Sequence, residues 1–192
     1  MISVHQTALP GVVIVEPQVF GDVRGYFFES WNQREFDRLV RPVRFVQDNE
    51  SRSRYGVVRG LHFQRAPHIQ SKLVRVVQGR VWDVAVDLRR GSPTFAQHVA
   101  VELSAENHRQ LFIPRGFAHG FAVLSEEAVF QYKCDNFYAP EVEGAVAWDD
   151  PALGIDWRLP AEDILLSERD RRHPVLSEAG ELFDYQIDYY AE

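Results

Sequence analysis

The sequence predicts an all-β fold, an antiparallel jelly roll with a few short helices. Short apolar or alternating segments recur from residue 12 to residue 133, with a spacing of roughly ten residues that is typical of such folds. Gly, Pro, Asn and Ser separate these segments, as turn residues do. We find no internal repeat, no low-complexity segment and no linker, so a single domain over residues 1–192 is expected.

The N-terminal quarter is expected to hold three strands and one helix. Strands are predicted at Val12–Pro17, Tyr26–Ser30 and Val43–Asp48, and residues 21–25 have the composition of a turn. Residues 32–40 place Phe36, Leu39 and Val40 at helical spacing, which predicts a short helix there.

The middle of the chain reads as a continuous series of strands. They are predicted at residues 57–64, 73–78, 81–88, 97–103, 111–113, 118–124 and 128–133. After about residue 135 the alternation loosens, and acidic, proline-containing loops lead to the segment 165–170.

Composition narrows the class of protein. The net charge of −7 argues against a general binder of nucleic acid or of membrane surfaces, so any bound anion needs a local cluster of Arg and Lys. Cys134 is the one cysteine, which excludes an internal disulfide and fits a reducing compartment. We see no secretory signal and no apolar run of membrane-spanning length, and therefore expect a cytoplasmic protein.

His62 is the first candidate functional residue. It lies in a strand-like segment, three residues after Arg59 and ten before Lys72. A neutral imidazole can accept a proton near pH 7, and the two cations could hold negative charge on a substrate. Strand alternation places His62 on one face with Gly60 and Gln64, which favours a polar site. A core histidine, hydrogen-bonded within the sheet, is the alternative.

Other readings of the polar residues stay open at this point. The His-x-His pair, Glu and further His of metal-binding jelly rolls are not found around His62, and His119 alone cannot complete a ligand set, so we expect no metal. Solvated surface charge would explain Lys72 and the arginines equally well. Residues 167–170 match a helix-capping box that would use Asp170, and Tyr132 could be a core aromatic.

The order of motifs along the chain closely resembles the dTDP-4-dehydrorhamnose 3,5-epimerase family, from roughly residue 10 to residue 175. The matching segments are Gly21–Glu29, Phe45–Ser51, Arg59–Gln64, Lys72–Arg75, Asp83–Arg89, Gly91–Phe95, Ile113–Phe121, Tyr132–Lys133, Tyr138–Glu141, Trp148–Pro151 and Leu166–Asp170. The resemblance implies a cupin-like jelly roll that uses neither metal nor cofactor and acts on a dTDP-4-keto-6-deoxyhexose.

The resemblance also implies roles for individual residues. His62 would be the base, Asp170 would orient its imidazole, Tyr132 would be the acid, and Lys72 would lie near the C4 carbonyl. The arginines would meet chiefly the diphosphate of the nucleotide-sugar, and Tyr138 would stack on its thymine. The residues implied to bind the nucleotide-sugar are Arg24, Phe27, Glu29, Gln47, Asp48, Asn49, Arg59, Lys72, His119, Tyr138, Glu143 and Arg169.

Two features depart from a simple reading. Arg169 stands where relatives often carry Lys, which preserves the charge but changes its geometry. Strict alternation would also put Arg59 and His62 on opposite faces, although the implied roles need both in one pocket. We therefore expect a bulge or bend at Gly60.

The implied reaction needs no cofactor, because the substrate's own carbonyl accepts the electrons when a proton leaves C3 or C5. His62 would remove that proton, Lys72 would stabilise the enolate oxygen, and Tyr132 would protonate the opposite face. The alternatives are an epimerase acting at C3 alone and a non-catalytic sugar-nucleotide binding protein or metal cupin. The resemblance further implies a homodimer whose sites receive Arg24 and Glu29 from the neighbouring subunit.

Overall fold

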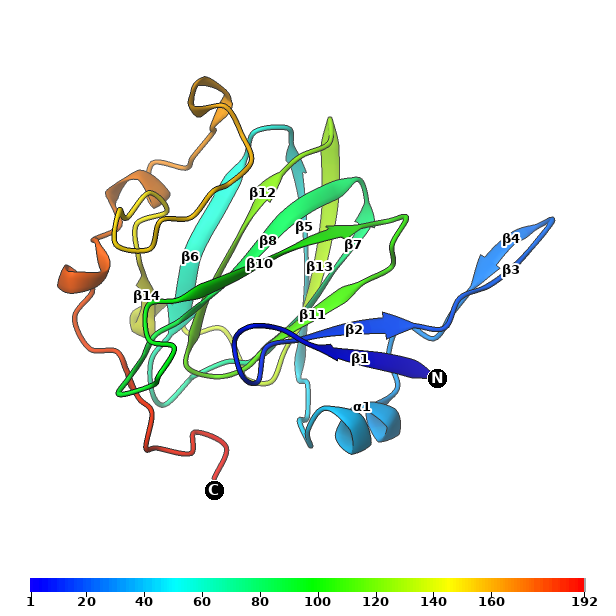
Figure 1. Ribbon diagram of the computed structural model, residues 1–192, viewed down its shortest axis with the longest axis horizontal. Helices are drawn as coiled ribbons and strands as arrows, with labels where there is room; N and C mark the ends of the chain where they lie inside the picture. Colours follow the sequence, from blue (N-terminus) through cyan, green and yellow to red (C-terminus); the bar gives the residue numbers. More distant parts are fainter. Residues whose placement is uncertain (192) are drawn as a thin grey trace.

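Two antiparallel sheets stack face to face in the computed structural model, which describes residues 1–191 (Figure 1). The six-stranded sheet runs in the order β1-β2-β11-β7-β13-β5, formed by Ile2–Gln6, Val13–Pro17, Gln110–Ile113, Lys72–Gln78, Glu127–Cys134 and Gln47–Arg54. The five-stranded sheet runs in the order β10-β8-β12-β6-β14, formed by His98–Ser104, Arg80–Asp87, Phe117–Val123, Val58–Gln64 and Glu143–Ala145. The all-β, cupin-like jelly roll predicted from the sequence is confirmed.

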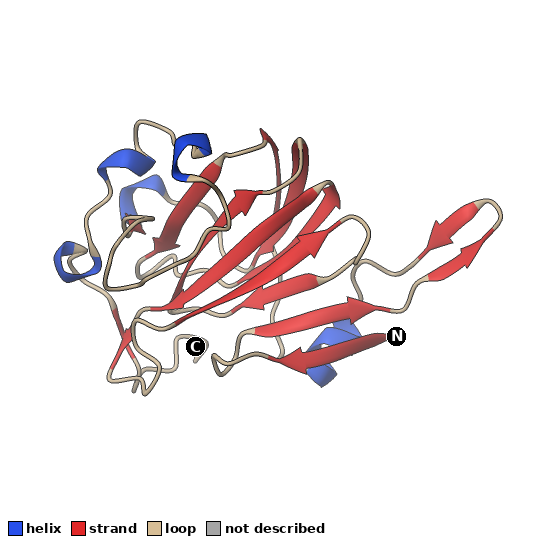
Figure 2. Ribbon diagram, turned by 45° about the horizontal axis from the view of Figure 1, so that its top comes forward, coloured by secondary structure: helices blue, strands red, loops and turns tan. Residues whose placement is uncertain are grey.

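Two small pairings and a few helices complete the described chain. Strands β3 (Phe20–Asp22) and β4 (Gly25–Phe27) form a hairpin that projects far from the sheets (Figures 1 and 2). Strands β9 (Arg89–Arg90) and β15 (Phe183–Asp184) pair in parallel. Helix α1 spans Gln33–Leu39, and 3-10 turns lie at Pro140–Val142, Ala161–Asp163, Asp170–Arg172 and Leu176–Glu178. No helix in residues 1–191 has the length and apolar character needed to cross a membrane.

The predicted strands between residues 57 and 134 are confirmed to within two residues at each end. Two predictions nearer the N-terminus need correction, those of the strands at 26–30 and 43–48. The strand predicted at 26–30 stops at Phe27, whereas the turn predicted at 21–25 is confirmed as the tight end of the β3–β4 hairpin. The strand predicted at 43–48 is displaced, because Val43 and Phe45 pack against Phe36 of α1 and pairing begins only at Gln47.

Three apolar clusters hold the layers together. The cluster between the sheets joins side chains such as Val74 and Phe130 of the six-stranded sheet to Val81 and Phe121 of the other. A second cluster lies on the outer face of the five-stranded sheet, where the C-terminal third of the chain covers it (Figure 2). The third lies between α1 and the outer face of β2 and β11. The core between the sheets fills one end of the barrel and leaves a polar pocket among β5, β6, β7, β12 and β13.

Candidate active site

Two adjoining cavities between the sheets share His62, Lys72 and Tyr132. One reaches inward along β12, and the other opens toward the loop after β13. His62 comes from the five-stranded sheet, whereas Lys72 and Tyr132 come from neighbouring strands of the six-stranded sheet, where Tyr132 is paired with Val74. The fold therefore places a candidate base on one wall of the pocket and a cation and a phenol on the opposite wall.

His62 is held by Asp170, as the sequence analysis predicts. Its Nε2 lies 2.7 Å from Asp170 Oδ1, and the aspartate side chain is only 7% exposed. Ser167 Oγ donates to Asp170 Oδ2 at 2.8 Å and accepts from the backbone N–H of Asp170 at 3.0 Å. The backbone N–H of Asp170 therefore makes the capping contact with Ser167, while its carboxylate contacts the imidazole of His62.

These contacts fix the charge of Asp170. Burial alone would raise the pKa of the carboxyl group, but the hydrogen bonds from His62 and Ser167 outweigh burial and leave this pKa below its usual value. An ionised carboxylate accepts a hydrogen bond and cannot donate one, so the His62 proton lies on Nε2. Nδ1 of His62 is then left with a free lone pair.

A bulge in β6 brings Arg59 into the same pocket as His62. Against β12, His119 pairs with His62 and Phe121 pairs with Arg59, so three steps along β6 match two along β12. Gly60 lies inside this bulge with a φ of +117°, and a Cβ there would lie 2.7 Å from the Cα of Gly120. The bulge expected at Gly60 is confirmed, and both side chains line the inner cavity.

Burial sets the protonation of the opposite wall. It raises the pKa of the Tyr132 phenol, which stays protonated and can act as a proton donor. It lowers the pKa of the Lys72 ammonium group, although Cys134 and two carboxylates oppose this shift. The Lys72 Nζ atom lies 5.8 Å from the centre of the Tyr132 ring. The pocket therefore offers the amine of Lys72 and a protonated phenol close together, and both groups can donate a hydrogen bond.

A second imidazole–carboxylate pair closes the inner end of the pocket. His119 Nε2 lies 2.9 Å from Asp83 Oδ2, and both side chains are buried. Burial raises the pKa of Asp83 and lowers that of His119, so it disfavours the carboxylate form of Asp83 and the imidazolium form of His119. His119 lines the cavity, as predicted, but its imidazole is already engaged with Asp83.

Polar residues predicted to bind substrate gather at the mouth of the pocket. The Tyr138 hydroxyl donates to Glu143 at 3.0 Å, and Arg169 forms an ion pair with the same carboxylate. Gln47 accepts from the backbone N–H of Tyr138 at 3.0 Å and donates to Asn49 at 3.0 Å. The Tyr138 ring is half exposed, so an aromatic face is open to a ligand beside the cationic Arg169.

Comparison with known proteins identifies this arrangement. The family model described as dTDP-4-dehydrorhamnose 3,5-epimerase matches residues 6–178. The chain belongs to this family.

Relatives of known name agree with this assignment. The dTDP-4-dehydrorhamnose 3,5-epimerase of Pseudomonas aeruginosa is 59% identical over 174 residues, covering 90% of this chain and 94% of that protein. The enzyme of the same name from Salmonella typhimurium is 56% identical over 183 residues, covering 93% and 98%. A crystal structure of the Legionella pneumophila dTDP-6-deoxy-D-glucose-3,5-epimerase, in complex with dTDP-4-keto-L-rhamnose, superposes with a TM-score of 0.93 at 48% identity, covering 97% and 100%.

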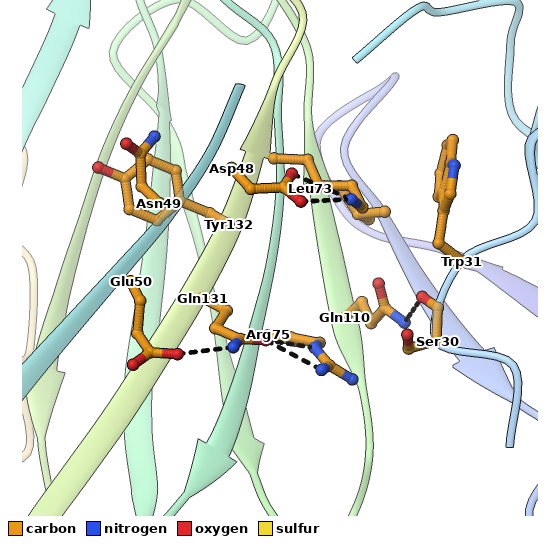
Figure 3. A pocket seen from close by; sticks show the side chains of 11 residues that line it. Ser30, Trp31, Asp48, Asn49, Glu50, Leu73, Arg75, Gln110, Gln131 and Tyr132 are labelled. Carbon is orange, nitrogen blue, oxygen red and sulfur yellow. Dashed lines mark hydrogen bonds and ion pairs between the residues drawn. The ribbon is translucent and has the colours of Figure 1, made fainter. Parts of the chain in front are cut away.

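Four residues that the family resemblance assigns to substrate binding lie outside the pocket. Asp48 points to the outer face of β5, where Lys133 donates to it at 3.0 Å (Figure 3). The others, Arg24, Phe27 and Glu29, lie on or beside the projecting hairpin; Arg24 pairs there with Asp22, and Glu29 accepts from Asn32.

Some residues that line the pocket or lie behind its walls were not found by sequence reasoning. Asp83 lies in a buried strand segment, and its side chain is linked to the pocket through its contact with His119 of the adjacent strand. Cys134 also lines the cavity, beside Gln64, which strand alternation places on the same face as His62. His173 lies beside Asp170 and packs edge-on against His62, with ring centres 5.4 Å apart. Because it follows the last matching motif, no spacing in the sequence marks it.

Proposed function

We propose that this protein converts dTDP-4-dehydro-6-deoxy-D-glucose into dTDP-4-dehydro-L-rhamnose by epimerisation at C3 and C5, a step of dTDP-L-rhamnose biosynthesis. The observation that carries the proposal is the His62–Asp170 pair facing Lys72 and Tyr132 across one pocket, in a chain of this family.

The base in this reaction is Nδ1 of His62. A hydrogen next to the C4 ketone becomes removable when the resulting enolate oxygen is stabilised. Asp170 keeps the proton on Nε2, presents the Nδ1 lone pair to the sugar, and stabilises the imidazolium that forms. The same pair serves C3 and C5 because both carbons flank the one carbonyl.

The opposite wall supplies charge and a proton. Lys72 donates to the enolate oxygen, in a pocket where burial strengthens the interaction. Tyr132 delivers a proton to the face opposite His62, consistent with a phenol whose pKa burial has raised. Removal from one face and delivery to the other inverts the carbon, and the substrate's carbonyl is the only electron acceptor that the reaction needs.

Residues at the mouth of the pocket and in its inner cavity bind the nucleotide. Arg59 and Arg169 meet the diphosphate, which prefers the planar donors of a guanidinium group. Tyr138 stacks on thymine, and Glu143 holds Tyr138 and Arg169 in place through its two contacts. Gln47, Asn49 and His119 complete the walls.

Incubation with dTDP-4-dehydro-6-deoxy-D-glucose in deuterated buffer tests the proposal. Deuterium at C3 and C5, with inversion of both, is the expected result by NMR. Deuterium and inversion confined to C3 would replace the proposal with a C3 epimerase. Tight binding of the nucleotide-sugar with no exchange would replace it with a binding protein.

We also propose that the active unit is a homodimer that shares residues between its sites. The β3–β4 hairpin exposes Val23, Tyr26 and Phe27, and it projects away from its own subunit (Figure 1). Exposed apolar side chains on a projecting arm are typical of a segment that packs against a partner. In the dimer, Arg24, Phe27 and Glu29 reach the neighbouring pocket.

Mixed dimers test this sharing. Neither an Arg24→Ala chain nor a His62→Ala chain should turn over substrate efficiently alone. If the arm serves the partner, half of the randomly mixed dimers contain one intact site, so about a quarter of the wild-type activity returns. If each arm serves its own subunit, mixing restores nothing and the proposal fails.

A further inference from the structure

Three potential metal-ligand atoms converge behind the proposed base. His62 Nε2, Asp170 Oδ1 and His173 Nδ1 all lie within 4.8 Å of one another. The carboxylate oxygen is 2.7 Å from His62 Nε2 and 3.6 Å from His173 Nδ1. His62 comes from β6, whereas the other two residues come from the 3-10 turn that packs beside this strand and the residue that follows it. Tertiary packing therefore assembles a His–Asp–His group.

His173 packs against His62, but one of its ring nitrogens has no hydrogen-bond partner among the described residues. Its side chain is only 9% exposed, and its Nδ1 is buried without a hydrogen-bond partner among residues 1–191. The distance to Asp170 exceeds that of a hydrogen bond. A buried polar nitrogen left without a partner costs free energy, and a ligand placed between the three residues would remove that cost.

We propose that His62, Asp170 and His173 form an inhibitory binding site for a divalent transition metal, with Zn²⁺ the preferred ion. Zinc binds imidazole nitrogen and carboxylate oxygen at about 2.0–2.2 Å in tetrahedral geometry, which separates neighbouring ligand atoms by about 3.4 Å. The two separations of 2.7 and 3.6 Å lie on either side of this value. Mg²⁺ prefers oxygen ligands and should not compete.

Binding there would stop the reaction without occupying the nucleotide site, a consequence that rests on the proposed function. Zinc takes the lone pair of His62 Nε2, so the single proton of the neutral imidazole moves to Nδ1. Nδ1 is the atom proposed to accept the substrate proton, and it then has no lone pair for that task. None of the residues proposed to contact thymine and diphosphate, Tyr138, Arg59 and Arg169, is a ligand of the zinc, so kcat should fall while KM changes little.

Metal binding can be measured without any reference to turnover. Protein treated with a chelator is titrated with Co²⁺, whose visible absorption reports four-coordinate nitrogen and oxygen ligation, and bound Co²⁺ is then displaced with ZnCl₂. One ion per chain is expected. His173→Gln should weaken Zn²⁺ binding at least about tenfold, since even indirect partners of a metal site contribute that much. His62→Ala should lose Co²⁺ binding, and the matched control His5→Gln, at an exposed histidine on β1, should bind as the wild type does.

Inhibition gives the second test. ZnCl₂ should inhibit the wild type reversibly, with recovery on adding EDTA, and His173→Gln should need at least tenfold more zinc while keeping its metal-free activity. Equal zinc affinity or equal inhibition of the wild type and His173→Gln would overturn the proposal, as would a wild type that binds neither ion. Specific binding by a protein that never turns over substrate would leave the metal site standing and refute the proposed function instead.

Discussion

Replacement of Asp170 by Asn tests the central electrostatic contact of the proposed mechanism. The amide keeps the size of the carboxyl group and can still present oxygen to His62 and nitrogen to Ser167, whose Oγ has a free acceptor position. Such an orientation leaves the imidazole in its correct tautomer. What the substitution removes is the negative charge beside the imidazolium that forms when His62 takes the substrate proton.

The magnitude follows from the geometry. With Nε2 and Oδ1 2.7 Å apart, the centres of the two charged groups are about 4 Å apart, and their attraction at an effective dielectric constant of about 20 is roughly 4 kcal/mol. Each 1.4 kcal/mol corresponds to a factor of about ten, so kcat should fall by about a thousandfold. An amide turned with its nitrogen toward His62 would enforce the wrong tautomer and deepen the loss toward ten-thousandfold, as in a serine-protease triad.

Steady-state kinetics and dTDP binding by calorimetry measure the two parts of this prediction. The Kd for dTDP should change little, because Asp170 lies behind the base rather than in the proposed nucleotide contact. Ser167→Ala is the matched control, because it removes the support of Asp170 but leaves the charge, and its kcat should fall by about tenfold at most. An Asp170→Asn enzyme within tenfold of wild-type kcat would refute the assignment of imidazolium stabilisation to this contact.

Four further predictions follow from the same structure. His62→Ala should abolish turnover and leave substrate affinity largely intact, because a base acts on the barrier; activity within tenfold of wild type would remove His62 from that role. Tyr132→Phe should exchange substrate hydrogen for solvent deuterium without inversion, as seen by NMR, whereas an equal fall in exchange and inversion would contradict the two-face mechanism. Gly60→Ala should lower the free energy of unfolding in urea by about 3 kcal/mol through its backbone clash and positive φ, against about 1 kcal/mol for Gly25→Ala, which meets no atom within 4 Å. Burial raises the pKa of Cys134 to about 11, so at pH 8 about one thiol in a thousand is ionised and alkylation should require unfolding; fast labelling of the native protein would refute this.

The strands that build the pocket could be predicted because their signals are local. Residues 57–134 alternate in polarity with turns between them, and the structure reproduces that series closely. Nearer the N-terminus, tertiary contacts override the pattern. Val43 and Phe45 have strand-like composition, but they pack against α1 and never join a sheet. An apolar run alone does not say which element will cover it.

The residues of the candidate site could likewise be predicted only in part. His62 and Lys72 lie in recognisable strand motifs, and the family resemblance supplied Asp170 and Tyr132. His173 could not be found, because its relation to His62 depends on how the C-terminal third folds back over the five-stranded sheet. The family resemblance placed Asp48 in the pocket, but alternation along β5 turns it away from the face of Gln47 and toward the outer groove drawn in Figure 3.

The bulge in β6 joins the two halves of the proposed substrate site. Arg59 and His62 share one pocket only because the bulge adds a residue between their pairings with β12. That extra residue requires glycine, since Gly60 has a positive φ and its Cα approaches the backbone of Gly120. The diphosphate contact and the base are therefore fixed to one another through a short, tightly packed stretch of backbone. Binding energy from a diphosphate held by Arg59 would be converted into the position of His62, as efficient catalysis at a distant carbon requires.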